Sequence, residues 1–141
     1  MRGLEFIRES VWLYPFLEIV HVVGIALLVG NLVLFELRVL GAGRALEAGA
    51  LARLALPLAL AGFALAALSG TVMFASQPGE LLPNLAFRWK MALVFAAGVN
   101  AAVFHARGSL AKHDRVARAQ ALGSLAIWIL VIACGRLIAY V

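Results

Sequence analysis

Residues 12–41 form an apolar stretch that is too long and too hydrophobic for a helix of a water-soluble domain. Its central part, residues 16–35, is interrupted only by Glu18, His21 and Asn31. A helix crosses the hydrocarbon core of a bilayer with about 20 such residues. The stretch therefore predicts a transmembrane helix. Ionisable groups inside such a helix are costly and usually functional.

Three further apolar segments follow, separated by loops that contain glycine, proline and charged residues. Only 13% of the residues are charged and the mean hydropathy is +1.01, values that exclude an ordinary soluble domain. The second segment is rich in alanine and glycine, which let helices approach closely in lipid. We expect an all-α fold, an integral membrane four-helix bundle forming one domain over residues 1–141, with spans at about 12–40, 54–75, 87–106 and 121–140.

The net charge of +5 does not indicate nucleic-acid binding, because the Lys and Arg residues are distributed between the apolar segments. The expected partner is the lipid bilayer, with no nucleic acid. Cys134 is the single cysteine and has no partner for an intrachain disulfide. The sequence contains no CxxCH motif, which excludes covalent c-type haem. The first residues do not resemble a removable signal peptide.

The basic residues of the loops predict the orientation of the bundle. The loops after the first and third spans share one side and contain Arg38, Arg44, Arg53, Arg107, Lys112, Arg115 and Arg118. The other side contains Arg2, Arg8, Arg88, Lys90 and Arg136. The positive-inside rule then predicts a multi-pass protein of the bacterial inner membrane with both termini in the periplasm.

The polar residues of the spans fall into two groups when depth is counted at 1.5 Å per residue. His21 lies roughly 6 Å to the outer side of the midplane and Lys90 about 10 Å. The outer group comprises Glu18, His21, Arg88, Lys90 and Arg136; the inner group comprises Asn31, Glu36, Arg38, Asn100 and His105. Such groups are typical of cofactor sites inside four-helix bundles.

His21 is the strongest candidate for a functional residue. Glu18 lies one turn away and could orient the imidazole, and Gly24 would clear room for a flat group. Arg136 requires a counter-charge, either Glu18 or an anionic ligand. The alternative for residues near the span ends is that their side chains extend to the interface, which applies to Arg88, Lys90, Glu36, Arg38 and His105.

The segments ESVWLYPFLEIVHVVGIALLVGNLVLFELRVLG, LAFRWKMALVFAAGVNAAVFH and GRLIAY resemble a family of small uncharacterised bacterial four-helix membrane proteins over nearly the whole chain. A histidine in the first span and a later helix that begins with RWK and ends with FH are more distantly similar to bacterial membrane protoporphyrinogen oxidase and to the membrane part of copper-resistance proteins. The oxidase family binds haem b through a first-helix histidine and has an important lysine at the start of a later helix. The resemblance places His21 and Lys90 at these positions, whereas His105 lies farther from Lys90 than the family pattern has.

The leading hypothesis is a b-type haem protein that acts in electron transfer or as a small membrane oxidoreductase; whether it is an enzyme stays open. Its cofactor-binding residues would be His21, Glu18, Gly24, Arg88, Lys90 and Arg136, with His21 and His105 as candidate metal ligands. The alternatives are a haem-free transport or binding module that handles protons or copper, and a structural membrane subunit. The sequence identifies no redox partner.

The two candidate histidines are not expected to bind one iron in one chain. Their depths differ by roughly 18 Å, whereas two axial ligands must lie at nearly the same depth. A homodimer with a two-fold axis along the membrane normal would bring two copies of His21 to one depth and is therefore compatible with the sequence.

Overall fold

A computed structural model describes residues 5–112, 114–138 and 140 of the chain. The described residues form helices and contain no strand. The long helices are α2 (Leu13–Val39), α3 (Ala48–Ser76), α5 (Leu85–Arg107) and α7 (Arg115–Leu137), and the short ones are α1 (Glu5–Glu9), α4 (Pro78–Leu81) and α6 (Ser109–Lys112). The four long helices are long and apolar enough to cross a membrane. The predicted all-α bundle of a membrane protein is confirmed.

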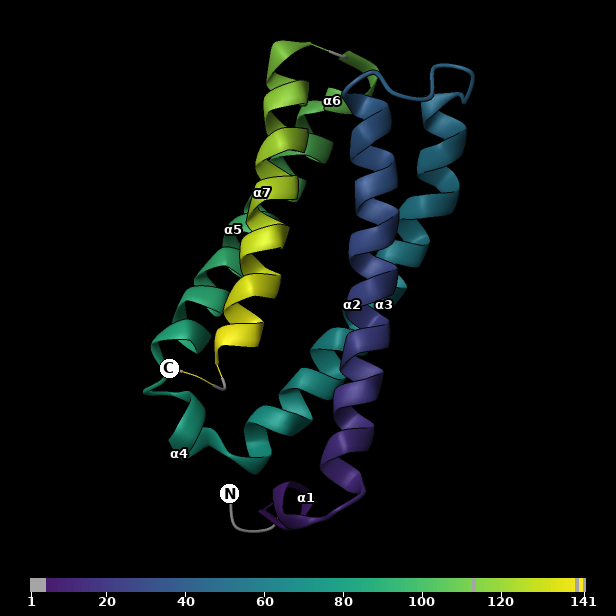
Figure 1. Ribbon diagram of the computed structural model, residues 1–141. Coiled ribbons are helices and arrows are strands. Elements are labelled where there is room, and N and C mark those ends of the chain that lie inside the picture. Colours follow the sequence, from purple (N-terminus) through teal and green to yellow (C-terminus); the bar gives the residue numbers. More distant parts are fainter. Residues whose placement is uncertain (1–4, 113, 139, 141) are drawn as a thin grey trace.

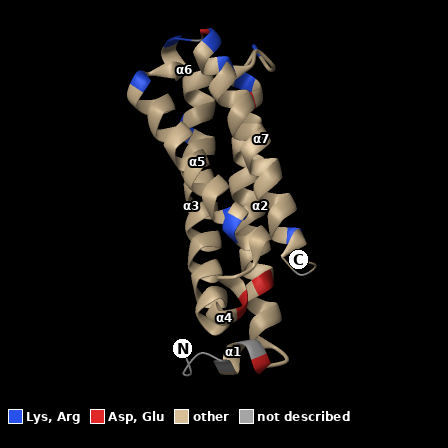
Figure 2. Cartoon of the chain, turned by 90° about the vertical axis from the view of Figure 1, so that its left-hand side faces the viewer, with Lys and Arg blue, Asp and Glu red and all other residues tan. Residues whose placement is uncertain are grey.

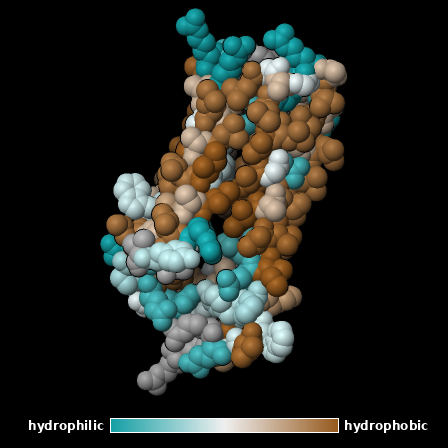
Figure 3. All heavy atoms as spheres, in the orientation of Figure 1, coloured by the Kyte–Doolittle hydropathy of each residue, from teal (hydrophilic) through white to brown (hydrophobic). Residues whose placement is uncertain are grey.

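The bundle consists of two helix pairs (Figure 1). Helix α2 packs along α3, α5 packs along α7, and the pairs meet mainly between α2 and α7. Figure 3 shows an apolar surface along the bundle with hydrophilic residues toward both ends, as a transmembrane bundle requires. Helix α1 and the C-terminal end of α7 lie at the end of the bundle opposite α6 (Figure 1).

The two pairs are joined by a buried core toward the α6 end. Its residues are Phe35, Val39, Ala52, Ala55, Phe104, Ala117 and Ala121. The rings of Phe35 and Phe104 meet edge to face, with centroids 5.8 Å apart. Farther from α6 the space-filling view shows the molecule hollowed between the pairs (Figure 3).

Local capping residues set where the long helices begin. The predicted cap Asn84 is confirmed, because its Oδ1 accepts a hydrogen bond from Phe87 N (3.1 Å). The predicted cap Ser10 is not the N-cap of α2, which is Trp12, although Ser10 Oγ accepts a hydrogen bond from Leu13 N (3.2 Å). Helices α3 and α7 begin before the predicted span starts, residues 54 and 121, because the carboxylates of Glu47 and Asp114 cap them.

The cap of α7 is held by an ion pair. Asp114 Oδ1 accepts a hydrogen bond from Ala117 N (2.9 Å), and its Oδ2 accepts one from Arg107 Nη2 (2.5 Å). The hydrogen bond from Arg107 is the main reason that the pKa of Asp114 lies below its ordinary value. The contact also fixes the turn between α5 and α7.

Helices α2 and α3 are in backbone contact where they cross. A Cβ atom on Gly24 would lie 2.6 Å from Ala66 N and 2.8 Å from Gly62 O, and one on Gly62 would lie 2.5 Å from Leu28 N. Only glycine fits at either position without moving a backbone. The interpretation of Gly24 as clearing room for a flat cofactor is therefore corrected, because α3 itself fills that space.

We expect Gly24→Ala to destabilise the protein by about 1–3 kcal/mol, the usual cost of an overpacked contact. Gly30→Ala is the matched control on the same helix, because a Cβ there meets nothing within 4 Å. Its effect should stay within about 1 kcal/mol of neutral. Unfolding in mixed micelles, followed by circular dichroism, measures both variants. Equal stability of the two variants would contradict the backbone contact at Gly24.

Candidate functional site

The imidazole of His21 is half-buried on α2 and turned toward α3. Its Nδ1 lies 2.9 Å from the carbonyl oxygen of Ala66 and 3.2 Å from Ser69 Oγ. A carbonyl oxygen can only accept, so Nδ1 carries the hydrogen. In the neutral ring Nε2 then keeps its lone pair and can accept a hydrogen bond or bind a metal.

Lys90 of α5 lies opposite this lone pair, with Nζ 3.5 Å from His21 Nε2. Two glycines make room for the pair. A Cβ on Gly70 would lie 3.1 Å from His21 Cε1, and one on Gly135 would lie 3.5 Å from Lys90 Nζ. Residues of α2, α3, α5 and α7 thus converge on one point, which we name the His21–Lys90 site.

Glu18 does not orient His21 as the sequence predicted. Its side chain is exposed, and the backbone carbonyl of Ala66 takes the place that was expected for its carboxylate. Residues three apart on a helix point about 60° from one another around the axis. The imidazole can therefore face α3 while Glu18 faces outward.

The two predicted arginines lie outside the contact between His21 and Lys90. Arg88 is exposed and its Nε donates to the carbonyl oxygen of Leu82 at 2.8 Å. Arg136 is exposed, with its guanidinium carbon 5.8 Å from the centre of the Tyr140 ring. The sequence predicted that Arg136 requires a counter-charge. In the structure its side chain is exposed and lies over the Tyr140 ring, and these surroundings take the place of the expected carboxylate.

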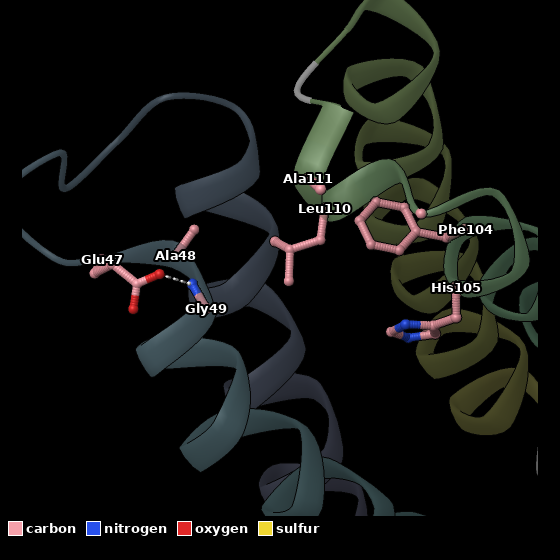
Figure 4. Close-up of a pocket in the computed structure, with 8 residues that line it drawn as sticks. Glu47, Ala48, Gly49, Phe104, His105, Leu110 and Ala111 are labelled. Atoms are coloured by element: carbon pink, nitrogen blue, oxygen red, sulfur yellow. Dashed lines mark hydrogen bonds between the residues drawn. The ribbon is translucent and has the colours of Figure 1, made fainter.

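His105 lies far from His21, near the opposite end of the bundle. It is exposed and packs edge to face on Phe104 at 5.4 Å. It lines a cavity of about 370 Å³ with Gly49 of α3 and with Glu47, the cap of that helix (Figure 4). Ala66, beside His21, follows this part of α3 by almost 20 residues, roughly 27 Å along a helix. The expected separation of the two histidines agrees with this arrangement. His113 lies outside the described residues.

No group of three or more His, Cys, Asp or Glu side chains that could hold a metal ion occurs among the described residues. A bare copper ion normally requires several imidazole or sulfur ligands. The His21–Lys90 site offers one imidazole nitrogen and one amine nitrogen. These two nitrogens therefore suit a metal ion whose other ligands belong to a bound cofactor.

The sequence did not identify the α3 and α7 residues that shape the site. Ser69 and Gly70 belong to the Ser-Gly-Thr break in the apolar run of α3, which is a signal that a polar partner lies opposite. We assigned the small residues of this helix to packing alone. Gly135 carries no comparable signal, because its role depends on where Lys90 lies.

Comparisons with models of protein families, with curated proteins and with solved structures found no match to this chain. The geometry of the bundle and of the His21–Lys90 site therefore carries the functional argument.

We expect Nδ1 of His21 to be protonated and Nε2 to be bare in the ligand-free protein. Nitrogen NMR of histidine-labelled protein in bicelles distinguishes the two tautomers, and the His21→Gln variant assigns the signal by its loss. A signal from Nε2–H of the neutral ring would contradict the hydrogen bond to Ala66.

Proposed function

We propose that this chain is a b-type haem-binding integral membrane protein that acts in electron transfer or as a small oxidoreductase. The observation that carries the proposal is that each ring nitrogen of His21 faces a polar atom: Nδ1 faces Ala66 O, and Nε2 faces Lys90 Nζ. A histidine that binds iron typically donates its other ring nitrogen to a backbone carbonyl, which fixes the ring and strengthens it as a ligand. His21 makes this contact with Ala66 and leaves Nε2 directed at the space between the helix pairs.

The donor set favours haem over a bare metal ion. The porphyrin supplies most of the iron ligands, so the protein needs to provide only one or two side chains. His21 Nε2 and Lys90 Nζ face one another from α2 and α5, 3.5 Å apart, and are the side chains that would hold such a group. A second His21 from a homodimer is not required, and dimerisation stays a prediction.

Each residue of the site has a defined role in this proposal. His21 would bind the iron while Ala66 O holds its ring, and Lys90 would be the second side chain that holds the group. Arg88 and Arg136 are exposed cations toward the same end of the bundle and are available to the haem carboxylates. The bound haem would supply one-electron chemistry. Glu18 and Gly24 have no role at the iron.

The alternatives receive less support. A copper site lacks a cluster of ligands among the described residues. A proton-handling module could use the same pair, since Lys90 can donate to His21 Nε2, and bound haem is the observation that would distinguish the two functions. A purely structural role does not explain why residues of four helices converge on one imidazole. The distant similarity of His21 and Lys90 to the oxidase family also favours haem.

The charges of the bundle ends support the proposed location in a bacterial inner membrane. Figure 2 shows Lys and Arg gathered at the end that carries α6, and acidic residues toward the opposite end. Basic loops stay in the cytoplasm. Both termini would then lie in the periplasm.

His21→Ala should remove most of the bound haem from protein produced in a haem-competent host. The loss follows because the variant lacks the nitrogen that bonds the iron. The measurement is the Soret absorbance per protein chain after purification. His105→Ala is the control, since that imidazole lies in another part of the bundle, and it should keep the wild-type absorbance. Equal haem content in wild type and His21→Ala would contradict the proposal.

A periplasm-active phosphatase fused to the C-terminus should be active, and a fluorescent protein that matures only in the cytoplasm should stay dark at the same position. The prediction follows from the excess of basic residues in the loops of the α6 end. The opposite pair of results would reverse the orientation without affecting the fold.

A further inference from the structure

A second cavity, of about 450 Å³, lies between the four long helices nearer the α6 end. Its volume falls within the range of small-molecule sites, about 300–1,000 Å³. Neither His21 nor Lys90 lines it. Any ligand held here is therefore independent of the proposed haem site.

Glu36 of α2 lines this cavity and brings a carboxyl group to it. The sequence suggested that its side chain extends to the interface, but the residue is only 5% exposed. Its carboxylate is hydrogen-bonded to the Ser124 side chain. The other oxygen, Oε2, is buried and has no hydrogen-bond partner among the residues that the structure describes. An unpaired buried carboxylate oxygen is costly, which indicates that a partner is supplied from elsewhere.

The walls of the cavity define what that partner can be. No Lys or Arg is among its lining residues, and His105 is the one other titratable group there. The remaining polar groups are already engaged in part, since Asn100 Nδ2 donates to the carbonyl oxygen of Gln120 at 2.9 Å. Aromatic side chains supply much of the wall: Phe35, Phe63, Phe104 and Trp128. A carboxylate together with aromatic faces attracts a cation whose body is apolar.

Access from the lipid is consistent with such a ligand. Helices α3 and α5 contact each other little along their described lengths. Leu60 and Phe63, which line the cavity from α3, are 69% and 39% exposed. The cavity therefore lies beside a surface that faces the hydrocarbon core, from which a lipophilic molecule can enter.

We propose that this cavity is a binding site for a lipophilic organic cation, with the Glu36 carboxylate as its counter-charge. The apolar body of the ligand packs against the aromatic walls, and its charge replaces the partner that Oε2 lacks. In the empty site a proton on the carboxyl takes the same role.

The test uses two ions of the same shape and opposite charge, tetraphenylphosphonium and tetraphenylborate, titrated into the purified full chain in neutral detergent. The wild type should bind the phosphonium saturably and the borate not at all. This comparison needs no variant. Equal binding of both ions, or saturable binding of neither, would overturn the proposal.

Two carboxylate variants on the same helix locate the site. Glu36→Gln keeps the shape of the side chain and should weaken phosphonium binding by roughly tenfold or more, the usual effect of removing one member of a buried charge pair. Glu18→Gln removes an exposed carboxylate and should leave binding unchanged. A loss in Glu18→Gln with none in Glu36→Gln would refute the assignment. Haem content at His21 is measured separately and does not enter either outcome.

Discussion

The backbone contact between α2 and α3 is the feature on which the rest of the structure depends. Glycines at positions 24 and 62 let the helices approach until their peptide groups touch. One turn along α2, this approach brings His21 within hydrogen-bond distance of the Ala66 carbonyl. A side chain at either glycine would separate the helices, and the imidazole would lose the contact that fixes its tautomer. Close packing of small residues in lipid thus sets the chemistry of the site.

The polar groups toward the two ends of the bundle differ in whether all their atoms have hydrogen-bond partners. His21 has partners at both ring nitrogens, although Lys90 at 3.5 Å is a long contact that another ligand of Nε2 could replace. Glu36 has one engaged oxygen and one without a partner in the described structure. The first arrangement presents a nitrogen donor, and the second presents a carboxyl group in an aromatic cavity. We propose a haem for the first and an organic cation for the second.

The helices were predictable because hydropathy and length alone determine spans, and the cap Asn84 because a cap is a local signal. The predicted start of α3 was too late because it was set by hydropathy. Residues 48–53 are helical because Glu47 caps the helix before them. The pairing of His21 could not be read from the sequence. Its partner is a backbone carbonyl, which every residue carries, whereas Glu18 was nearby in sequence but faces outward. Similarly, only the packing of four helices shows that Glu36 is buried.

The central proposal is that His21 and Lys90 would together hold one haem iron. Electron paramagnetic resonance of the oxidised protein tests this claim most directly, because it reports how many strong ligands the iron has. The account predicts a low-spin signal for the wild type and a high-spin signal for Lys90→Leu, whose side chain cannot bind iron, with haem retained in both. A low-spin signal that persists in Lys90→Leu would contradict it and would show that the second ligand comes from elsewhere.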